Sequence, residues 1–154
     1  MAHSFTTFIW PDAWKEAKSA APLEWTAVKF EAEDPLEVPE QRGVYAFVIS
    51  VDGTIMPPHG CIMYFGQTGA TSKRTLRDRY RDYLRERRKG PKRQLIKWLF
   101  DLWGNHLLFY YAPVPDEQIS LEDIETSLNN AVIPSCSVND FTAEVRGLIP
   151  VLRA

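Results

Sequence analysis

The sequence predicts a single α+β domain, a small sandwich in which helices flank a three-stranded, mostly antiparallel sheet. Two observations predict this class. Runs of β-branched and aromatic residues occur three times, and the stretches between and after them have helical periodicity interrupted by Gly and Pro. The length of 154 residues, with 45% hydrophobic residues, is enough for one core and too short for two.

The first two strands form a predicted hairpin. Residues 43–53 read GVYAFVISVDG, a β-branched and aromatic strand closed by an Asp-Gly turn. Residues 61–66 read CIMYFG and form the second strand. Because the link between the two runs is rich in turn residues, we expect an antiparallel pair.

Two helices follow the hairpin. Thr71 and Ser72 offer an N-cap for a helix over residues 73–88, which the Gly90-Pro91 pair ends. A second helix is predicted within residues 92–103, where leucines and a tryptophan share one stripe.

The third strand and the last helix complete the order. Residues 106–114, HLLFYYAPV, predict a strand that ends at prolines. Ser120 followed by Asp123 resembles a capping box and predicts a helix from 121 to about 132. The predicted order from residue 43 is therefore β-β-α-α-β-α.

The chain divides into three parts. Residues 1–40 form an N-terminal extension that we expect to pack on the core, with a helical start at residues 10–12 and strand-like alternation over 25–30. Residues 41–140 form the main domain. Residues 141–154 form a C-terminal segment with an apolar stretch.

Composition argues against several classes of protein. No apolar run approaches the length of about twenty residues that crosses a bilayer, and no basic start precedes an apolar secretory signal. The two cysteines fit reduced thiols, and the three histidines lack the spacing of a zinc site. We therefore expect a cytoplasmic protein without a membrane partner.

The charge distribution favours a polyanionic partner. Residues 73–97 hold twelve of the eighteen Lys and Arg but only three acidic residues, so this block carries +9 and the rest of the chain −11. A solvated helix face is the ordinary interpretation of a charge run. The surplus exceeds what Asp–Arg pairs along the helix neutralise, which favours phosphate binding.

Two charged residues lie on predicted inward faces. Arg79 shares the edge marked by Leu76 and Tyr83, and Glu125 borders the apolar stripe of the last predicted helix. A buried charge needs a partner, so the two side chains either pair across the core or converge on a substrate. Tyr45, Tyr64 and Tyr83 on neighbouring inward positions favour the second interpretation.

An ordered set of motifs resembles the GIY-YIG nucleases, a family that includes homing endonucleases and the nuclease of an excision-repair incision enzyme. The set comprises Gly-Val-Tyr at 43–45, Tyr-Phe-Gly at 64–66, LRDRYRDYL in a helix, and EDIETSLNNAVIP leading to Asn139. The resemblance covers about residues 41–140. It implies the family fold and a metal-dependent endonuclease that hydrolyses phosphodiester bonds in DNA, with RNA as an open alternative.

The resemblance also implies site residues. Tyr45 and Tyr64 look like the motif tyrosines, one of which helps to activate water. Arg79 looks like the arginine on the scissile phosphate, with Tyr83 one turn later. Glu125 looks like the single protein ligand of one Mg²⁺ or Mn²⁺, a hard cation that prefers oxygen. Asn139 resembles the asparagine that closes the motif.

A second group is expected to bind nucleic acid. Gly66 would let the backbone approach a phosphate, Gln67 stands where some family members have a lysine, and the basic residues would follow the strand without reading its sequence. These basic residues are Arg77, Arg81, Arg85, Arg88, Lys89, Lys92 and Arg93. No recognition module is evident, so a separate protein is an expected source of specificity. The alternative function is a catalytically silent nucleic-acid-binding adaptor.

Overall fold

The computed structural model describes residues 5–31, 36–51 and 57–152 and has an α+β fold, as predicted. A four-stranded antiparallel sheet, in the order β2-β5-β3-β4, forms its centre. These strands are β2 (Thr26–Lys29), β3 (Gly43–Val51), β4 (His59–Thr68) and β5 (Leu107–Pro113). A separate two-stranded sheet pairs β1 (Phe8–Ile9) with β6 (Val132–Ile133).

The prediction of a three-stranded sheet is wrong. The N-terminal segment contributes β2, in which Val28 pairs with Phe109 of β5. Without β2 the long strand β5 would present a free edge of unpaired backbone groups, which proteins usually cover. The extension is thus part of the main sheet, and not only packed on it.

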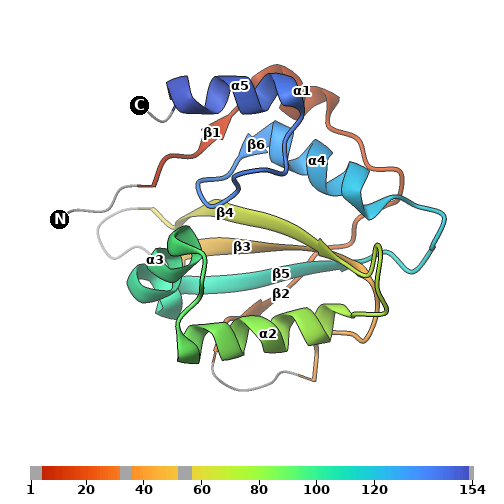
Figure 1. Ribbon diagram of the computed structural model, residues 1–154, viewed down its shortest axis with the longest axis vertical. Coiled ribbons are helices and arrows are strands. Elements are labelled where there is room, and N and C mark those ends of the chain that lie inside the picture. The colour runs from red at the N-terminus through yellow and green to blue at the C-terminus, as the bar shows by residue number, and fades with distance from the viewer. Residues whose placement is uncertain (1–4, 32–35, 52–56, 153–154) are drawn as a thin grey trace.

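Helices cover both faces of the sheet (Figure 1). On one face lie α2 (Leu76–Lys89) and α3 (Gln94–Trp103), whose buried residues share a core with the β3 side chains Tyr45 and Phe47. On the other face α4 (Leu121–Ala131) packs against Val44 of β3. The outer layer beyond α4 consists of the other two α-helices: α1 (Pro11–Glu16), which contacts α4, and α5 (Ala143–Leu152).

The helix ends follow local chemistry. The first helix after the hairpin begins later than predicted, because Thr75 is its N-cap rather than Thr71 or Ser72. The Thr75 hydroxyl accepts a hydrogen bond from the Asp78 N–H, and the Asp78 carboxylate accepts one from the Thr75 N–H at 3.0 Å. This reciprocal capping box satisfies two N–H groups that no helical carbonyl reaches. The Ser120 hydroxyl caps α4 as predicted.

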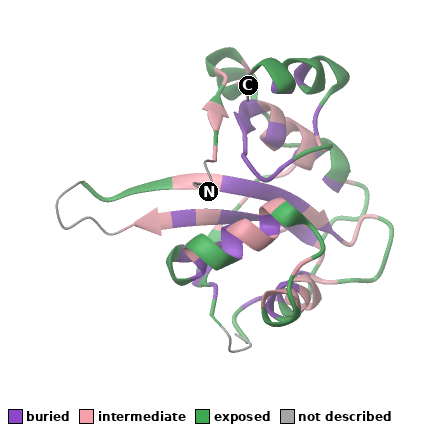
Figure 2. Cartoon of the chain, turned by 60° about the vertical axis from the view of Figure 1, so that its left-hand side comes forward, coloured by how far each residue is buried: buried purple, intermediate pink, exposed green. Residues whose placement is uncertain are grey.

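A β-bulge sets the side-chain directions of the hairpin. Phe47 pairs with Tyr64 but the next residue, Val48, pairs with Ile62, so Met63 is an extra residue in β4. Paired residues share one face of a sheet, which places Tyr64 on the same face as Tyr45 and Phe47. In Figure 2 this buried stretch of the hairpin gives way to exposed residues toward its turn.

Candidate active site

Three buried tyrosines from three elements bring their hydroxyl groups together beneath α2 and α3. Tyr45 lies on β3, Tyr64 on β4 and Tyr83 on α2, and each is less than 8% exposed. The hydroxyls of Tyr45 and Tyr83 are 3.1 Å apart, and the rings of Tyr45 and Tyr64 have centroids 6.2 Å apart. The expected convergence of these residues is therefore present in the structure.

Two arginines donate hydrogen bonds to these hydroxyls. Arg79 donates from Nε to Tyr45 at 3.0 Å and from a terminal nitrogen to Tyr83 at 3.1 Å. Arg93 donates to Tyr64 at 3.2 Å and to Tyr83 at 3.1 Å. Each guanidinium also lies over the ring of Tyr83, at 4.5 Å for Arg79 and 5.7 Å for Arg93. The cluster thus holds two positive charges on neutral oxygens.

Sequence reasoning missed this position of Arg93. It grouped Arg93 with the outward basic residues that follow a nucleic-acid strand, because Arg93 follows Gly90-Pro91 in a basic, turn-rich stretch. In the structure Arg93 is the residue immediately before α3, and its side chain turns back toward the sheet face. Only the path of the chain between α2 and α3 could have revealed this.

Gly66 makes room for Tyr45, and not only for an approaching ligand. The two residues are cross-strand partners, and a Cβ atom on Gly66 would lie 2.4 Å from the Tyr45 hydroxyl oxygen. No side chain tolerates such an approach, so the glycine fixes where the tyrosine hydroxyl lies. The expected approach of a phosphate to the Gly66 backbone stays a prediction.

We expect Gly66→Ala to destabilise the protein by about 1–3 kcal/mol, the usual cost of overpacking a core. The midpoint temperature of thermal unfolding should fall by several degrees. Gly147→Ala is the matched control, because Gly147 lies in α5 and a Cβ there would meet nothing within 4 Å. Alanine has a higher helix propensity than glycine, so this control substitution should be neutral or slightly stabilising. Equal stability of the two variants would contradict the steric role of Gly66.

Glu125 lies on α4 as a half-buried carboxylate. Burial, followed by the charges of Asp140 and Glu122, raises its pKa to about 7, although Arg79 lowers it. Among the described residues no cation lies within 4 Å of the Glu125 carboxylate, so it does not form the core ion pair with Arg79 that was one alternative. Glu125 nevertheless raises the pKa of Tyr64, and Arg79 lowers that of Glu125, so the carboxylate lies within electrostatic range of the cluster although α4 covers the other face of the sheet.

Asn139 lies outside the tyrosine–arginine cluster. It is exposed, and its backbone carbonyl accepts a hydrogen bond from Arg146 at 3.1 Å. Its neighbour Asp140 acts on the Glu125 carboxylate, so the turn that carries both residues lies near that end of the site. The role of Asn139 as a catalytic residue stays a prediction.

The tyrosine hydroxyls are protonated at neutral pH. Burial raises the pKa of Tyr45 well above its ordinary value, and the two neighbouring tyrosines raise it further, although Arg79 lowers it. Burial likewise raises the pKa of Tyr64, and Arg93 only partly offsets this effect. In this state both groups can position a water molecule or a phosphate oxygen by hydrogen bonding, while neither is ready to accept a proton.

Arg77 is not available to a nucleic acid in the way we predicted. Its guanidinium donates to the carbonyl oxygens of Val38 at 2.7 Å and Leu36 at 2.9 Å, and it forms an ion pair with Glu40 at 2.6 Å. Its side chain is only 18% exposed. Arg77 therefore holds the loop before β3 against α2.

The remaining predicted basic residues lie on the surface. Arg85 forms an ion pair with Asp82, whose carboxylate also contacts Arg74, and Arg88 donates to the Leu84 carbonyl of its own helix at 3.3 Å. Exposed residues of the predicted surface are Arg81, Arg85, Arg88, Lys89, Lys92 and Arg93. They lie on α2, the helix that carries Arg79, and in the turn after it.

Gln67 lies one residue beyond Gly66 and therefore faces the opposite side of the sheet from Tyr45. Its side-chain oxygen is buried without a hydrogen-bond partner. The lysine-like role suggested by the resemblance would require a side chain beside the tyrosines. In this structure the cation next to Tyr64 is Arg93.

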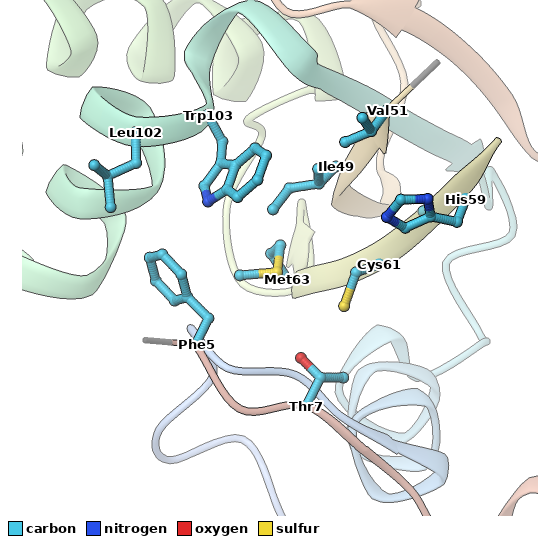
Figure 3. Close-up of a pocket in the computed structure, with 10 residues that line it drawn as sticks. Phe5, Thr7, Ile49, Val51, His59, Cys61, Met63, Leu102 and Trp103 are labelled. Atoms are coloured by element: carbon cyan, nitrogen blue, oxygen red, sulfur yellow. The ribbon is translucent and has the colours of Figure 1, made fainter. Parts of the chain in front are cut away.

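A separate hollow lies at the other end of the hairpin. It has a volume of about 630 Å³ and is lined by side chains of the N-terminal segment, β3, β4 and α3, including Thr7, Cys61, Met63 and Trp103 (Figure 3). No residue predicted for the site lines it. Its chemistry is mainly apolar and does not extend the tyrosine–arginine cluster.

Two further findings bear on the predicted cofactor and location. Within residues 5–31, 36–51 and 57–152, no three His, Cys, Asp or Glu side chains form a group that could hold a metal ion. In the same described ranges, no helix is long and apolar enough to span a bilayer.

Comparison with known proteins gives no relative. No protein-family model matches the chain, and no curated protein or solved structure matches it. Function must therefore be argued from the site itself.

Proposed function

We propose that this protein is a metal-dependent endonuclease that hydrolyses phosphodiester bonds in DNA. The observation that carries the proposal is the cluster itself. Two guanidinium groups and three tyrosine hydroxyls lie on one face of the sheet, and the Glu125 carboxylate on α4, which is in electrostatic range of Tyr64 and Arg79, has no ion-pair partner among the described residues. The ordered motifs that resemble the GIY-YIG nucleases support the same chemistry.

The residue types suit phosphoryl chemistry. A phosphodiester gains negative charge on its non-bridging oxygens as water attacks, and fixed positive charge lowers the energy of that state. Arg79 can donate to such an oxygen in a fork that a lysine does not provide. The hydroxyls of Tyr45, Tyr64 and Tyr83 can orient the attacking water and the phosphate by hydrogen bonding. Burial of the cluster keeps bulk water from weakening these interactions.

Glu125 fits a divalent cation. A half-buried carboxylate whose pKa is raised to about 7 is unfavourably charged at neutral pH, and a cation would relieve that cost. Carboxylate oxygen is the ligand that Mg²⁺ and Mn²⁺ prefer. When bound there, the metal would supply Lewis-acid stabilisation of phosphate charge and a lower pKa for bound water. Asp140, whose charge raises the pKa of Glu125, would add to the negative potential that attracts the ion.

The exposed basic residues on α2 and the following turn would bind the strand that carries the reacting phosphate. Such contacts neutralise backbone charge and position the duplex without reading its sequence. Arg81, Arg85 and Lys92 are examples. A separate protein that supplies specificity remains part of the proposal.

A nicking assay tests the proposal. Supercoiled plasmid incubated with the full chain should be converted to open circles with Mg²⁺ or Mn²⁺ and should stay intact in excess EDTA. The same preparation should be tried on branched DNA, single strands and RNA to define the substrate. Absence of cleavage on all of these with either metal would refute the proposed nuclease.

The second candidate function is a silent nucleic-acid-binding adaptor. The specific observation in its favour is that burial keeps Tyr45 and Tyr64 protonated, so neither hydroxyl is ready to act as a base. This alternative predicts strong DNA binding in EDTA that weakens as salt rises, together with no cleavage under any divalent metal. The nicking assay and a salt titration of binding therefore separate the two candidates.

A further inference from the structure

Arg93 is exposed, but its guanidinium lies against the tyrosine cluster, where a ligand-binding residue is expected. Its guanidinium contacts only neutral tyrosine oxygens, those of Tyr64 and Tyr83. In the described part of the chain no carboxylate lies within 4 Å of it. The residue is exposed, so an anion can reach it, and a cation that faces only neutral groups attracts an anion.

Arg79 also donates to two tyrosine hydroxyls, and the side chains of Arg79 and Arg93 meet on one oxygen. The Tyr83 hydroxyl accepts from Arg79 at 3.1 Å and from Arg93 at 3.1 Å. The nearest carboxylate to Arg79 is that of Asp82, at 3.9 Å, and this carboxylate is already shared with Arg74 and Arg85. Two like charges held this close are unfavourable unless an anion lies between them.

Both guanidiniums have N–H groups that the tyrosine hydroxyls do not use. Each has five N–H groups, and the tyrosine bonds use two nitrogens of each arginine. The start of α3 adds to the positive potential, because Arg93 is its N-cap and no side chain caps the first N–H groups of this ten-residue helix. Two guanidiniums and the uncapped start of a helix on the same face of the sheet therefore contribute positive potential.

We propose that Arg93 and Arg79 together clamp one phosphate group of the substrate, each guanidinium donating to a different non-bridging oxygen. Arg93 is then a substrate-contacting residue of the reaction centre, and not part of the surface that follows the strand. The anion clamp follows from the geometry alone, while the nature of the bound phosphate, a phosphodiester of DNA, rests on the proposed function.

The first test measures anion binding without any reaction. Inorganic phosphate is added to the full chain in EDTA, at constant ionic strength set with chloride, and thermal unfolding is followed. We expect phosphate to raise the unfolding temperature of the wild type, to have no effect on Arg93→Ala, and to have a reduced effect on Arg93→Lys. Lys15→Ala is the control and should respond like the wild type, since Lys15 is exposed on α1 and lies outside the predicted basic surface.

Tyr64→Phe separates phosphate binding from a purely structural role. This variant removes a hydroxyl that Arg93 holds but keeps the guanidinium, so phosphate should still stabilise it. If Arg93 only supported the tyrosines, Tyr64→Phe and Arg93→Ala would lose part of the same interaction and phosphate would stabilise both or neither. That result, or a wild-type response to phosphate in Arg93→Ala, would overturn the clamp.

The second test uses cleavage at saturating DNA with Mg²⁺. Arg93→Ala should lower the rate by about 100-fold or more, the usual effect of losing one donor to transition-state charge, while Lys15→Ala should stay within about threefold of the wild type. An unchanged rate in Arg93→Ala would overturn the role of Arg93 but leave the nuclease intact. If the wild type cuts nothing, the proposed function fails, and the phosphate titration alone decides the clamp.

Discussion

Glu125→Gln will abolish metal-dependent cleavage and, above pH 7, will make the folded protein more stable. The two effects have one cause. The carboxylate has a pKa raised to about 7, first by burial and then by Asp140 and Glu122, so its ionised form is stabilised less by the folded protein than by water. A glutamine of the same shape carries no charge. It therefore loses the affinity for a cation and also avoids the free-energy cost of a half-buried negative charge.

The direction of the pH dependence follows from linkage. Between pH 4.5 and about 7 the folded protein binds more protons at Glu125 than the unfolded chain does, so its stability falls as the pH rises and then levels off. The stability of Glu125→Gln does not fall in this way with pH, because glutamine does not titrate. It should match the wild type near pH 4.5 and exceed it at pH 8 by up to about 2 kcal/mol, a value already reduced for solvent screening of a half-buried group.

The measurements are chemical denaturation at the two pH values and plasmid nicking with Mg²⁺. Glu117→Gln is the matched control, since it makes the same charge change at an exposed residue in the loop before α4. We expect it to be neutral in both assays. Wild-type activity should also rise with pH up to about 7, because protons compete with the metal for the carboxylate. A glutamine variant that nicks like the wild type would remove Glu125 from the metal site.

Much of the fold could be predicted from local pattern. Alternation and turn residues located β3, β4 and β5, and a Ser-x-x-Asp pattern located the start of α4, because these signals are written within a few neighbouring residues. The fourth strand was harder to predict. Its short run at Thr26–Lys29 becomes a strand only because β5 offers a free edge more than seventy residues later in the chain.

The candidate site divides in the same way. The inward positions of Arg79, Tyr83 and Glu125 follow from helical periodicity, so the sequence could predict that charge would meet aromatic hydroxyls. The position of Arg93 and the use of Arg77 could not be predicted. Both depend on where a loop runs: the turn between α2 and α3 brings Arg93 back to the sheet, and the segment before β3 covers Arg77.

Gly66 shows a third kind of limit. A glycine two residues after Tyr64 can mark a bulge, a turn or a close approach, and the sequence does not say to what. The cross-strand register answers this, because Tyr45 lies directly over it. The positions of the hydroxyl groups thus depend on Gly66, on the bulge at Met63 and on the pairing of β3 with β4. All three are properties of strand pairing rather than of local sequence.

Arg79→Ala is expected to lower the cleavage rate at saturating DNA by about 1,000-fold while leaving the protein folded. Arg79 is 27% exposed and donates to two hydroxyls that already lie 3.1 Å from each other, so Tyr45 and Tyr83 keep a partner when it is removed. The loss therefore falls on the transition state, where a guanidinium next to the developing phosphate charge has no substitute. Arg79→Lys keeps the positive charge but lacks the planar guanidinium, so its cleavage rate should lie between those of the wild type and Arg79→Ala.

Arg85→Ala gives the contrast that makes this prediction sharp. Arg85 lies on the same helix and contacts the same Asp82, but its side chain is 62% exposed. If it contacts only backbone phosphate, its removal should weaken DNA binding modestly and reduce the salt dependence of binding by about one unit of slope, with little change in rate at saturating DNA. Arg79→Ala should instead leave the salt dependence of DNA binding nearly unchanged and lower the rate at saturating DNA. Similar rates for the two variants at saturation would mean that the reaction centre lies elsewhere, because a catalytic cation and a strand-binding cation cannot have the same kinetic signature.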